Sequence, residues 1–508
     1  MKRSRRKSAT AAFTVAVLAT LAPADRAHAH VGSSDVFHEG DAGPYRLLVS
    51  VRPPDVIPGT AHVEVRSAAP ATGELRVTIV PLPLNGPGSS SAPTPDVATR
   101  SHDDVSLFTG RLWLMATGSW QVRVHVDGPL GSGDLAVPVP ALPLRTKVMG
   151  VGLGSILLGL LIFLFAGLVS IVGASVRDAD LAPDQPPDAR SRRRGRIAQV
   201  TAAVILLVVV FAGASWWDSE ARVYQRWVYK PLTLEATTVA DPTAAAASGV
   251  TLSLALHDPG WLRSRRLDDL LPDHGHLMHL FVVRLPELDF VGHLHPQQQT
   301  PGLFTKTLPA LPPGDYQLFA DIVHRTGLAE TATAQVPLPA ALTGTPTGDD
   351  SIAPAPPLRA ADVHRTTAAL ADGTRVVWLR DGSPIVAGRP TWFRFRVEDR
   401  DGKPATDLSP YMGMAGHALF IKHDRTVFAH VHPTGSVPMA ALMLVNPDSA
   451  AGADPHAGNA MHRAALPPEV GFPYACPQPG RYRIVVQVKR GDTVETGVFD
   501  AEVVAKAP

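Results

Sequence analysis

One pattern occurs twice in this chain and constrains its fold more than any other feature. The segments HLFVVRLPELDFVGHLHP and HALFIKHDRTVFAHVHP each contain a lone histidine, two short apolar runs separated by a polar break, and a closing His-x-His-Pro. Short β-rich runs interrupted by turn residues are typical of a β-hairpin. The sequence therefore predicts two related β modules, each containing one such hairpin.

The position of the break predicts the register of each hairpin. In the second hairpin, pairing outward from residues 424–425 puts Leu419 opposite His430 and His417 opposite His432. Residues opposite each other on an antiparallel pair share a face, as do residues two apart on one strand. The second hairpin is therefore expected to gather three imidazoles on one surface. A slip of one residue would scatter them.

The first hairpin repeats this arrangement. Pairing Arg284 with Phe290 puts His279 opposite His295, and His293 shares their face. Imidazole is the commonest protein ligand for metals, so the two triads are predicted to be two metal sites. Histidines that only pack in the core and bond backbone carbonyls remain the alternative interpretation.

The turns upstream of the two hairpins differ in an informative way. The first copy has His274 and His276, at five and three residues before its lone histidine, and the second has Met412 and Met414 at the same offsets. Nitrogen ligands suit Cu(II) and Zn(II), whereas thioethers favour Cu(I). Exchange of histidine for methionine at matched positions predicts copper, with zinc as the alternative, and adds these four residues to the candidate ligands.

Three segments predict export and membrane anchoring. Residues 1–29 have a basic start, an apolar stretch and a small-x-small cleavage site, which is typical of a signal peptide. Residues 148–176 and 197–217 are apolar and long enough to be transmembrane helices. The arginine-rich loop 177–196 between them marks the cytoplasmic side. We expect a multi-pass protein of the bacterial cell membrane, with both large parts extracytoplasmic.

Composition limits the function further. The formal net charge is +1, which gives no reason to expect nucleic-acid binding. The single cysteine, Cys476, excludes an intrachain disulfide and is expected to be a packed core residue.

A second repeat predicts three modules of one fold. The segments TGSWQVRVHVDGP, PGDYQLFADIVHRTG and PGRYRIVVQVKRG each read Gly, one residue, an aromatic residue and an alternating strand, and each is followed by one more strand. Alternation bounded by Pro and Gly predicts a mainly β chain of three immunoglobulin-like antiparallel β-sandwich modules. They are expected at 30–145, 231–340 and 359–506, with a Pro-rich linker at 341–358 that has little to pack.

The first module lacks the histidine hairpin but offers another candidate. Cleavage after residue 29 would make His30 the N-terminal residue, whose amine and imidazole together suit tetragonal Cu(II). Candidate partners are His38, His102 and His125, although alternation in QVRVHV turns His125 away from the core. His324, after the second Gly-x-aromatic, is a further candidate for the first hairpin site.

These residues carry two resemblances. The segments LMHLFVV…FVGHLHP and AGHALFI…FAHVHP, each followed by PGxY, resemble the YtkA-like family of bacterial extracytoplasmic β-sandwich domains over roughly the last 280 residues. The family is usually placed among copper and cytochrome-oxidase accessory proteins, so the resemblance implies metal handling rather than a known reaction. An N-terminal His30 is similar to that of CopC-type copper-resistance proteins, although the first module has no Asp-x-His.

Three functions follow from these observations. The leading hypothesis is a membrane-anchored copper chaperone or copper-homeostasis protein, serving a membrane client such as a transporter or an oxidase under assembly. The alternative is a docking protein whose histidines are structural. An oxidative enzyme is the third, and the absence of any HExxH, GxSxG, P-loop or dinucleotide motif argues against it. No residue pattern indicates the oligomeric state.

Overall fold

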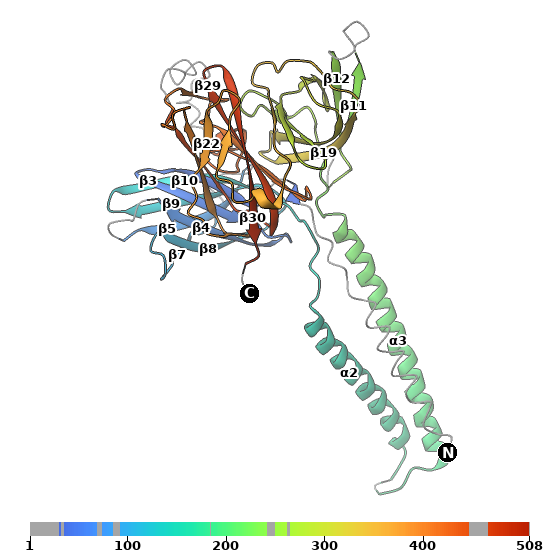
Figure 1. Cartoon of the computed structure of the whole chain (residues 1–508). Helices are drawn as coiled ribbons and strands as arrows, with labels where there is room; N and C mark the ends of the chain where they lie inside the picture. The colour runs from blue at the N-terminus through green and yellow to red at the C-terminus, as the bar shows by residue number, and fades with distance from the viewer. Residues whose placement is uncertain are drawn as a thin grey trace, which may run out of the picture.

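The computed structural model describes most of the chain as strands, with two long helices that project from the body formed by the strands (Figure 1). The chain is mainly β, and its strands form several predominantly antiparallel sheets. The predicted signal peptide lies outside the described residues. These are 30–31, 35–68, 74–84, 92–182, 184–240, 249–261, 265–446 and 466–506.

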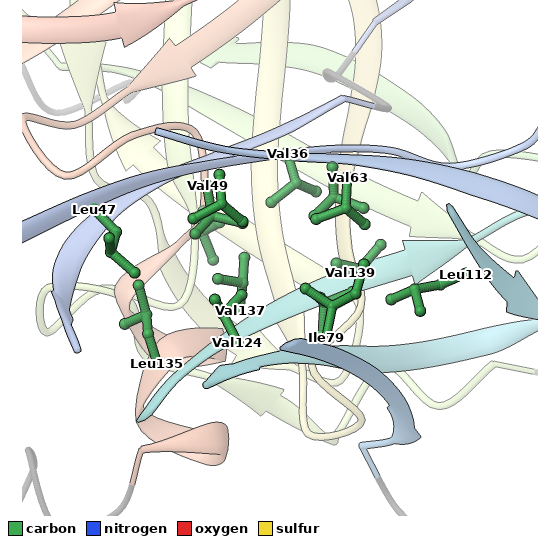
Figure 2. Close-up of a cluster of buried hydrophobic side chains, with 14 of the residues drawn as sticks. Val36, Leu47, Val49, Val63, Ile79, Leu112, Val124, Leu135, Val137 and Val139 are labelled. Atoms are coloured by element: carbon green, nitrogen blue, oxygen red, sulfur yellow. The ribbon is translucent and has the colours of Figure 1, made fainter. Parts of the chain in front are cut away.

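The first module has two sheets around one core. One sheet has the order β2-β3-β4-β8-β7, formed by β2 (Val36–Ala42), β3 (Tyr45–Arg52), β4 (Gly59–Ser67), β8 (Leu107–Leu114) and β7 (Thr99–Arg100). The other has the order β10-β9-β5-β6, formed by β10 (Gly131–Ala141), β9 (Gly118–Gly128), β5 (Arg76–Pro83) and β6 (Asp96–Val97). Side chains such as Val49, Val124 and Val137 from both sheets meet between them (Figure 2). As predicted, His125 faces away from this core.

The second module also has two sheets. One has the order β11-β12-β17-β16, formed by β11 (Thr233–Ala240), β12 (Val250–His257), β17 (Leu303–Thr307) and β16 (Gln297–Thr300). The other has the order β13-β18-β14-β15-β20, formed by β13 (Leu270–Leu271), β18 (Gly314–His324), β14 (His279–Arg284), β15 (Phe290–Leu294) and β20 (Ser351–Pro354), with β19 (Ala329–Leu338) also on β18. The first histidine hairpin is β14–β15, in the second of these sheets.

The third module repeats this plan after the short 3-10 helix η2 (Ala360–Asp362). One sheet is formed by β21 (Thr367–Ala369), β22 (Arg375–Trp378), β24 (Thr391–Glu398) and β28 (Glu469–Tyr474). The other has the order β1-β27-β26-β29-β30-β23, formed by β1 (His30–Val31), β27 (Val427–Val431), β26 (His417–Lys422), β29 (Gly480–Arg490), β30 (Thr493–Val504) and β23 (Ile385–Val386), with β25 (Leu408–Ser409) on β29. Cys476 is buried in this module's core, as expected.

The predicted Gly-x-aromatic repeat marks the same strand in each module. Gly118, Gly314 and Gly480 begin the 11-residue strands β9, β18 and β29. Their φ angles of 138°, 147° and 131° lie where side chains are strained, so glycine is needed there. Each strand then pairs with the next one along the chain, as the repeat predicts.

The hairpin sheets of the second and third modules face each other across an apolar interface. Phe281 and Phe319 of the second module pack with Phe428 and Val485 of the third, and the rings of Phe319 and Phe428 stack at 4.1 Å. Each hairpin therefore presents the same face to its counterpart. Since the histidines lie on this face, the two triads are brought to one interface.

The first module is joined to this pair by a short helix. Helix α4 (Met439–Val445), from the third module, contributes Ala440, Ala441 and Leu442 to the core of the first module. Strand β2 also binds the third module. The carbonyl oxygen of Phe37 accepts a hydrogen bond from the backbone nitrogen of Ser436, and the Phe37 side chain packs in the core of the third module. The three modules thus share core residues.

Two apolar helices leave the body side by side (Figure 1). Helix α2 (Val151–Asp178) and helix α3 (Ala189–Gln225) are long and apolar enough to cross a membrane. The predicted bounds need one correction. Helix α3 begins at Ala189, where the side chain of Asp188 caps it. Most of the arginines assigned to the loop, from Arg190 to Arg196, therefore lie in the first turns of α3.

The prediction that the linker 341–358 has little to pack is wrong. Residues Ser351–Pro354 form β20, which pairs with β15 of the first histidine hairpin. Asp350 and Ser351 are only 6% and 4% exposed. Two acidic residues and a serine in a Pro/Thr/Gly-rich segment show no alternation of apolar and polar residues. Their burial beside the hairpin could therefore not be predicted from the sequence.

Candidate metal centre

Both hairpins have the predicted register. In the first, Leu280 pairs with Leu294 and Phe281 with His293. In the second, Leu419 pairs with His430 and Phe420 with Ala429. His279 and His295, like His417 and His432, are the next positions along these registers. Each hairpin therefore gathers its three histidines on one face.

The first triad is compact and buried. One ring nitrogen from each of His279, His293 and His295 lies within 4.8 Å of the others, as three ligands to one ion require. Nδ1 of His279 is 3.0 Å from Nε2 of His293. The three residues are 2%, 0% and 6% exposed, so water has little access to their rings.

The second triad repeats this geometry. His417, His430 and His432 also have ring nitrogens within 4.8 Å of one another, and Nδ1 of His417 is 3.0 Å from Nε2 of His430. The rings of His430 and His432 are 4.5 Å apart. The duplication has thus preserved the arrangement of the nitrogens as well as the spacing of the residues.

In the first triad, hydrogen-bond partners fix which nitrogens carry a hydrogen. Nε2 of His279 lies 3.0 Å from the carbonyl oxygen of Asp273, and Nδ1 of His293 lies 3.1 Å from Oε1 of Gln487. Nδ1 of His295 lies 3.3 Å from Oδ1 of Asp350. These oxygens can only accept, so the named nitrogens donate and the opposite nitrogen of each neutral ring keeps a lone pair.

Two histidines of the second triad follow the same rule. Nε2 of His417 donates to the carbonyl oxygen of Tyr411 at 3.2 Å, and Nδ1 of His432 donates to that of Val437 at 3.3 Å. Nδ1 of His430 faces Oδ2 of Asp321 at 3.6 Å. In the first triad, two lone-pair nitrogens therefore face each other at 3.0 Å with no hydrogen between them. An acceptor bound to the far nitrogen of a histidine is how proteins orient metal-ligating imidazoles.

Burial keeps these rings neutral. It lowers the pKa of His279, His293, His417 and His432 well below the ordinary value, and neighbouring imidazoles lower it further. Burial also lowers the pKa of His430 to about 3. A neutral imidazole is the form that binds a metal, and protonation is therefore a poor way to relieve the facing lone pairs.

The central histidine of each triad, His293 or His430, contacts a polar residue of the other module. Gln487 lies opposite His417 in the third module, yet it orients His293 of the second. Asp321 lies opposite His279 in the second module, yet it faces His430 of the third. Each triad is therefore completed only when the two modules are docked.

The predicted turn ligands adopt equivalent backbone conformations. His274 and Met412 both have φ of 50°, and short bridges close both turns, from Asp273 to His276 and from Tyr411 to Met414. His276 stacks on His295 of the first triad at 3.9 Å, so it lies beside the site for which it is predicted. His274 was predicted at the first site, but its ring is closer to His432 and His417, at 4.9 and 5.3 Å, than to His279, at 6.2 Å.

Several histidines lie outside the two triads. The backbone of His30 pairs with Val427 in β27, whereas its side chain is outside the described residues. His38 is buried, and its backbone bridges Gly435 in the loop after His432. His125 pairs with Asp127 and Asp134 at the surface. His102 and His423 are exposed, and His456 and His462 fall outside the described residues.

The site residues that the sequence did not predict lie mainly around the triads, where they contact the histidines or the partners of the histidines. Asp349 is 3.4 Å from Nε2 of His276, and Lys306 pairs with Asp350 at 2.5 Å. Tyr411 donates to the carbonyl oxygen of Asp349 at 2.8 Å. These contacts join segments far apart in the sequence, so no local spacing signals them.

A cavity of about 450 Å³ reaches the histidines from the side where the helices attach. His279, His430 and His432 line its inner end. Leu144, just before α2, and Tyr229, just after α3, line it as well. The cavity adjoins all three modules and is lined by histidines of both triads.

His324 belongs to an ionic network beside this cavity and not to the first site. Its Nδ1 lies 2.9 Å from Asp269, and its Nε2 lies 2.9 Å from Glu330, so both nitrogens donate to carboxylates. Glu330 also binds Tyr229 and Arg265. With both nitrogens donating, the ring is an imidazolium and has no lone pair for a metal.

This network predicts a pH dependence of stability. Burial alone lowers the pKa of His324, but its hydrogen bonds with Glu330 and Asp269 outweigh burial and raise the pKa above its ordinary value. Its stabilising contribution is therefore complete below about pH 6.5 and is lost as the pH rises through the raised pKa. We expect the thermal midpoint of the full chain to fall as the pH rises above that value.

The measurement is thermal unfolding in detergent at a series of pH values, for wild type and His324→Gln. The variant should lose part of this pH dependence. His257→Gln, at an exposed histidine of the same module, is the control and should keep it. An unchanged pH dependence in His324→Gln would contradict the assignment.

A known family model matches the two modules that contain the histidine hairpins. A family model described as a domain of unknown function (DUF8832) matches residues 233–339 and 368–505. These segments are the second and third modules, and the match to both agrees with their common hairpin geometry. The matched model is neither the YtkA-like nor the CopC-type family, so those two resemblances remain predictions from the sequence.

Other comparisons add little. No curated protein matches the chain. Solved structures with some similarity include a tetra-tandem repeat in the extending region of a large adhesion protein (TM-score 0.16, 10% identity, covering 89% of this chain and 71% of that one). Domains 4 and 5 of the S-layer protein SbsC (0.14, 13%, 54% and 98%) and alpha-2-macroglobulin of E. coli (0.21, 10%, 94% and 23%) are also similar. At these TM-scores, the similarity carries no argument about function.

Proposed function

We propose that this chain is a membrane-anchored metal-binding protein with one site in each triad of facing histidines. The observation that carries the proposal is the orientation of the imidazoles, five of which donate to an oxygen from one nitrogen and turn the other nitrogen toward their triad. Histidines serving only in packing have no reason to converge their lone pairs. Unpaired buried polar atoms cost about 1–3 kcal/mol each, and a metal ion would remove that cost.

Copper is the metal we propose, with zinc as the alternative. Three imidazoles fit either ion, and they leave a coordination position open in a four-coordinate site. Met412 and Met414 stand in the turn positions that His274 and His276 occupy in the other copy, and a thioether at such a position favours Cu(I).

The function we propose is that of a carrier or chaperone. The nearest carboxylates orient histidines: Asp350 binds His295 and Lys306, and Asp321 faces His430. That use of the carboxylates favours binding over general-base catalysis. In this proposal the modules are immunoglobulin-like sandwiches on the extracytoplasmic face of a bacterial membrane, held there by α2 and α3, near a client such as a transporter or an oxidase under assembly.

The test is the metal content of the full chain in detergent, after exposure to excess Cu(I), Cu(II) or Zn(II) and removal of unbound metal. Wild type should retain two ions of one metal per chain. The pair His279→Ala and His295→Ala should retain one, as should the pair His417→Ala and His432→Ala, and the fourfold variant should retain none.

The controls are His257→Ala and His423→Ala, which remove an exposed histidine from each of the same modules and should retain two ions. Circular dichroism verifies that every variant keeps its β structure. Absence of tightly bound metal from folded wild type would overturn the proposal and leave the histidines as part of a docking interface between modules.

A further inference from the structure

The turn that precedes the first hairpin lies against the triad of the other module. Asp273 accepts from the backbone nitrogen of Ala440 in α4 at 2.7 Å, so the third module holds the turn in place. The ring of the next residue, His274, lies 4.9 Å from that of His432 and 5.3 Å from that of His417, both in the third module. One ligand atom each from Asp273, His274 and His432 lie within 4.8 Å of one another.

Two buried nitrogens at this point have no hydrogen-bond partner among the described residues. They are Nε2 of His274 and Nε2 of His432. The side chain of His274 is only 4% exposed, although its residue lies in a turn. A buried imidazole nitrogen without a partner is costly, and here two of them converge from different modules.

The second triad alone offers three nitrogens, and a closed tetrahedral site takes four. We infer that His274 is the fourth ligand of the second site, supplied across the interface by the second module. The inference rests on the proposed function and deepens it, because the second site then differs from the first in closing on four imidazoles. A metal ion bound there would link the second and third modules directly.

The carboxylate of Asp273 is a less suitable fourth ligand. Its Oδ1 is bound by the backbone of α4, and its Oδ2 is 4.0 Å from Nε2 of His274. Its carbonyl oxygen already accepts from His279 of the first triad. Asp273 is therefore a positioning residue, which holds His274 toward the second site and His279 toward the first.

The test isolates the second site in the full chain by using the His279→Ala and His295→Ala background. Substitution of His274 must respect its positive φ, which asparagine tolerates better than most residues. In this background, His274→Asn should weaken binding of Cu(II) or Zn(II), measured by competition with a chelator, by about 100-fold or more, since even the residues that support ligands are worth 10–100-fold.

Two further readouts separate a ligand from a structural residue. Electron paramagnetic resonance of bound Cu(II) should show four coupled nitrogens in the background protein and three after His274→Asn. His274→Met should keep its affinity for Cu(I) while its affinity for Cu(II) and Zn(II) falls, because a thioether replaces an imidazole. His257→Ala in the same background is the control, since that histidine is exposed on the same module, and it should change neither quantity.

The outcomes distinguish the two claims. Unchanged affinity and four coupled nitrogens after His274→Asn would overturn the inference, while metal in the background protein would still support the proposed function. A background protein that is folded but binds no metal would overturn both.

Discussion

Copper at about a thousand times its dissociation constant should raise the free energy of unfolding by about 4 kcal/mol for each site. The lone pairs of the two triads converge only in the folded and docked modules, so the metal binds the folded chain far better than the unfolded one. For modules of this size, such an increase should raise the thermal midpoint by roughly 10 °C per site. Thermal unfolding in detergent, with and without metal, measures it.

Histidine variants show which site is responsible for the increase in stability. Replacing His279 and His295, or His417 and His432, should halve the increase, and replacing all four should abolish it. The exposed residues His257 and His423 should have no influence when changed to alanine. An increase that persists in the fourfold variant would mean that the ion binds elsewhere, and this would contradict the assignment of the triads.

Replacing Asp500 by alanine should lower the free energy of unfolding by about 3–5 kcal/mol, because it leaves the guanidinium of Arg483 buried without its counter-charge. Arg483 is 0% and Asp500 4% exposed, and two hydrogen bonds of 2.9 and 3.0 Å join them. Arg483 also donates to the carbonyl oxygen of Leu288 in the first hairpin. The pair therefore supports the interface on which both triads depend.

The same strand pair provides the matched control. Glu502 lies opposite Arg481, two pairs away from Arg483 and Asp500 on β29 and β30 and so on the same face, but it is exposed. Glu502→Ala should change stability by less than about 1 kcal/mol. The double variant Arg483→Met and Asp500→Leu should recover much of the loss, since it removes both charges together. A loss in the double variant as large as that in Asp500→Ala would refute this account.

The parts of the site that sequence could predict are the local ones. A polar break between two apolar runs determines which residues face each other in a hairpin, and this was enough to place His279 beside His295 and His417 beside His432. The repeated Gly-x-aromatic pattern located the long strand of each module, because only glycine adopts the backbone conformation that begins it.

The parts that escaped prediction depend on how the modules dock. Gln487 and Asp321 are ordinary polar residues within their strands, and nothing near them in the sequence indicates that each orients a histidine of the other module. His274 was assigned to the hairpin nearest in sequence, whereas docking turns it toward the other one. Asp350 lay in a segment with linker composition, and its burial depends on pairing between β20 and β15.

The shared cores have a consequence for how the protein is made. Val437, Ala440, Ala441 and Leu442 belong to the core of the first module, although they are synthesised long after it and after both apolar helices. The first module must therefore leave the ribosome with part of its apolar core uncovered, and its maturation must wait for the C-terminal module. A truncation that removes α4 should therefore leave part of the first module's core exposed and cause misfolding beyond the deleted segment.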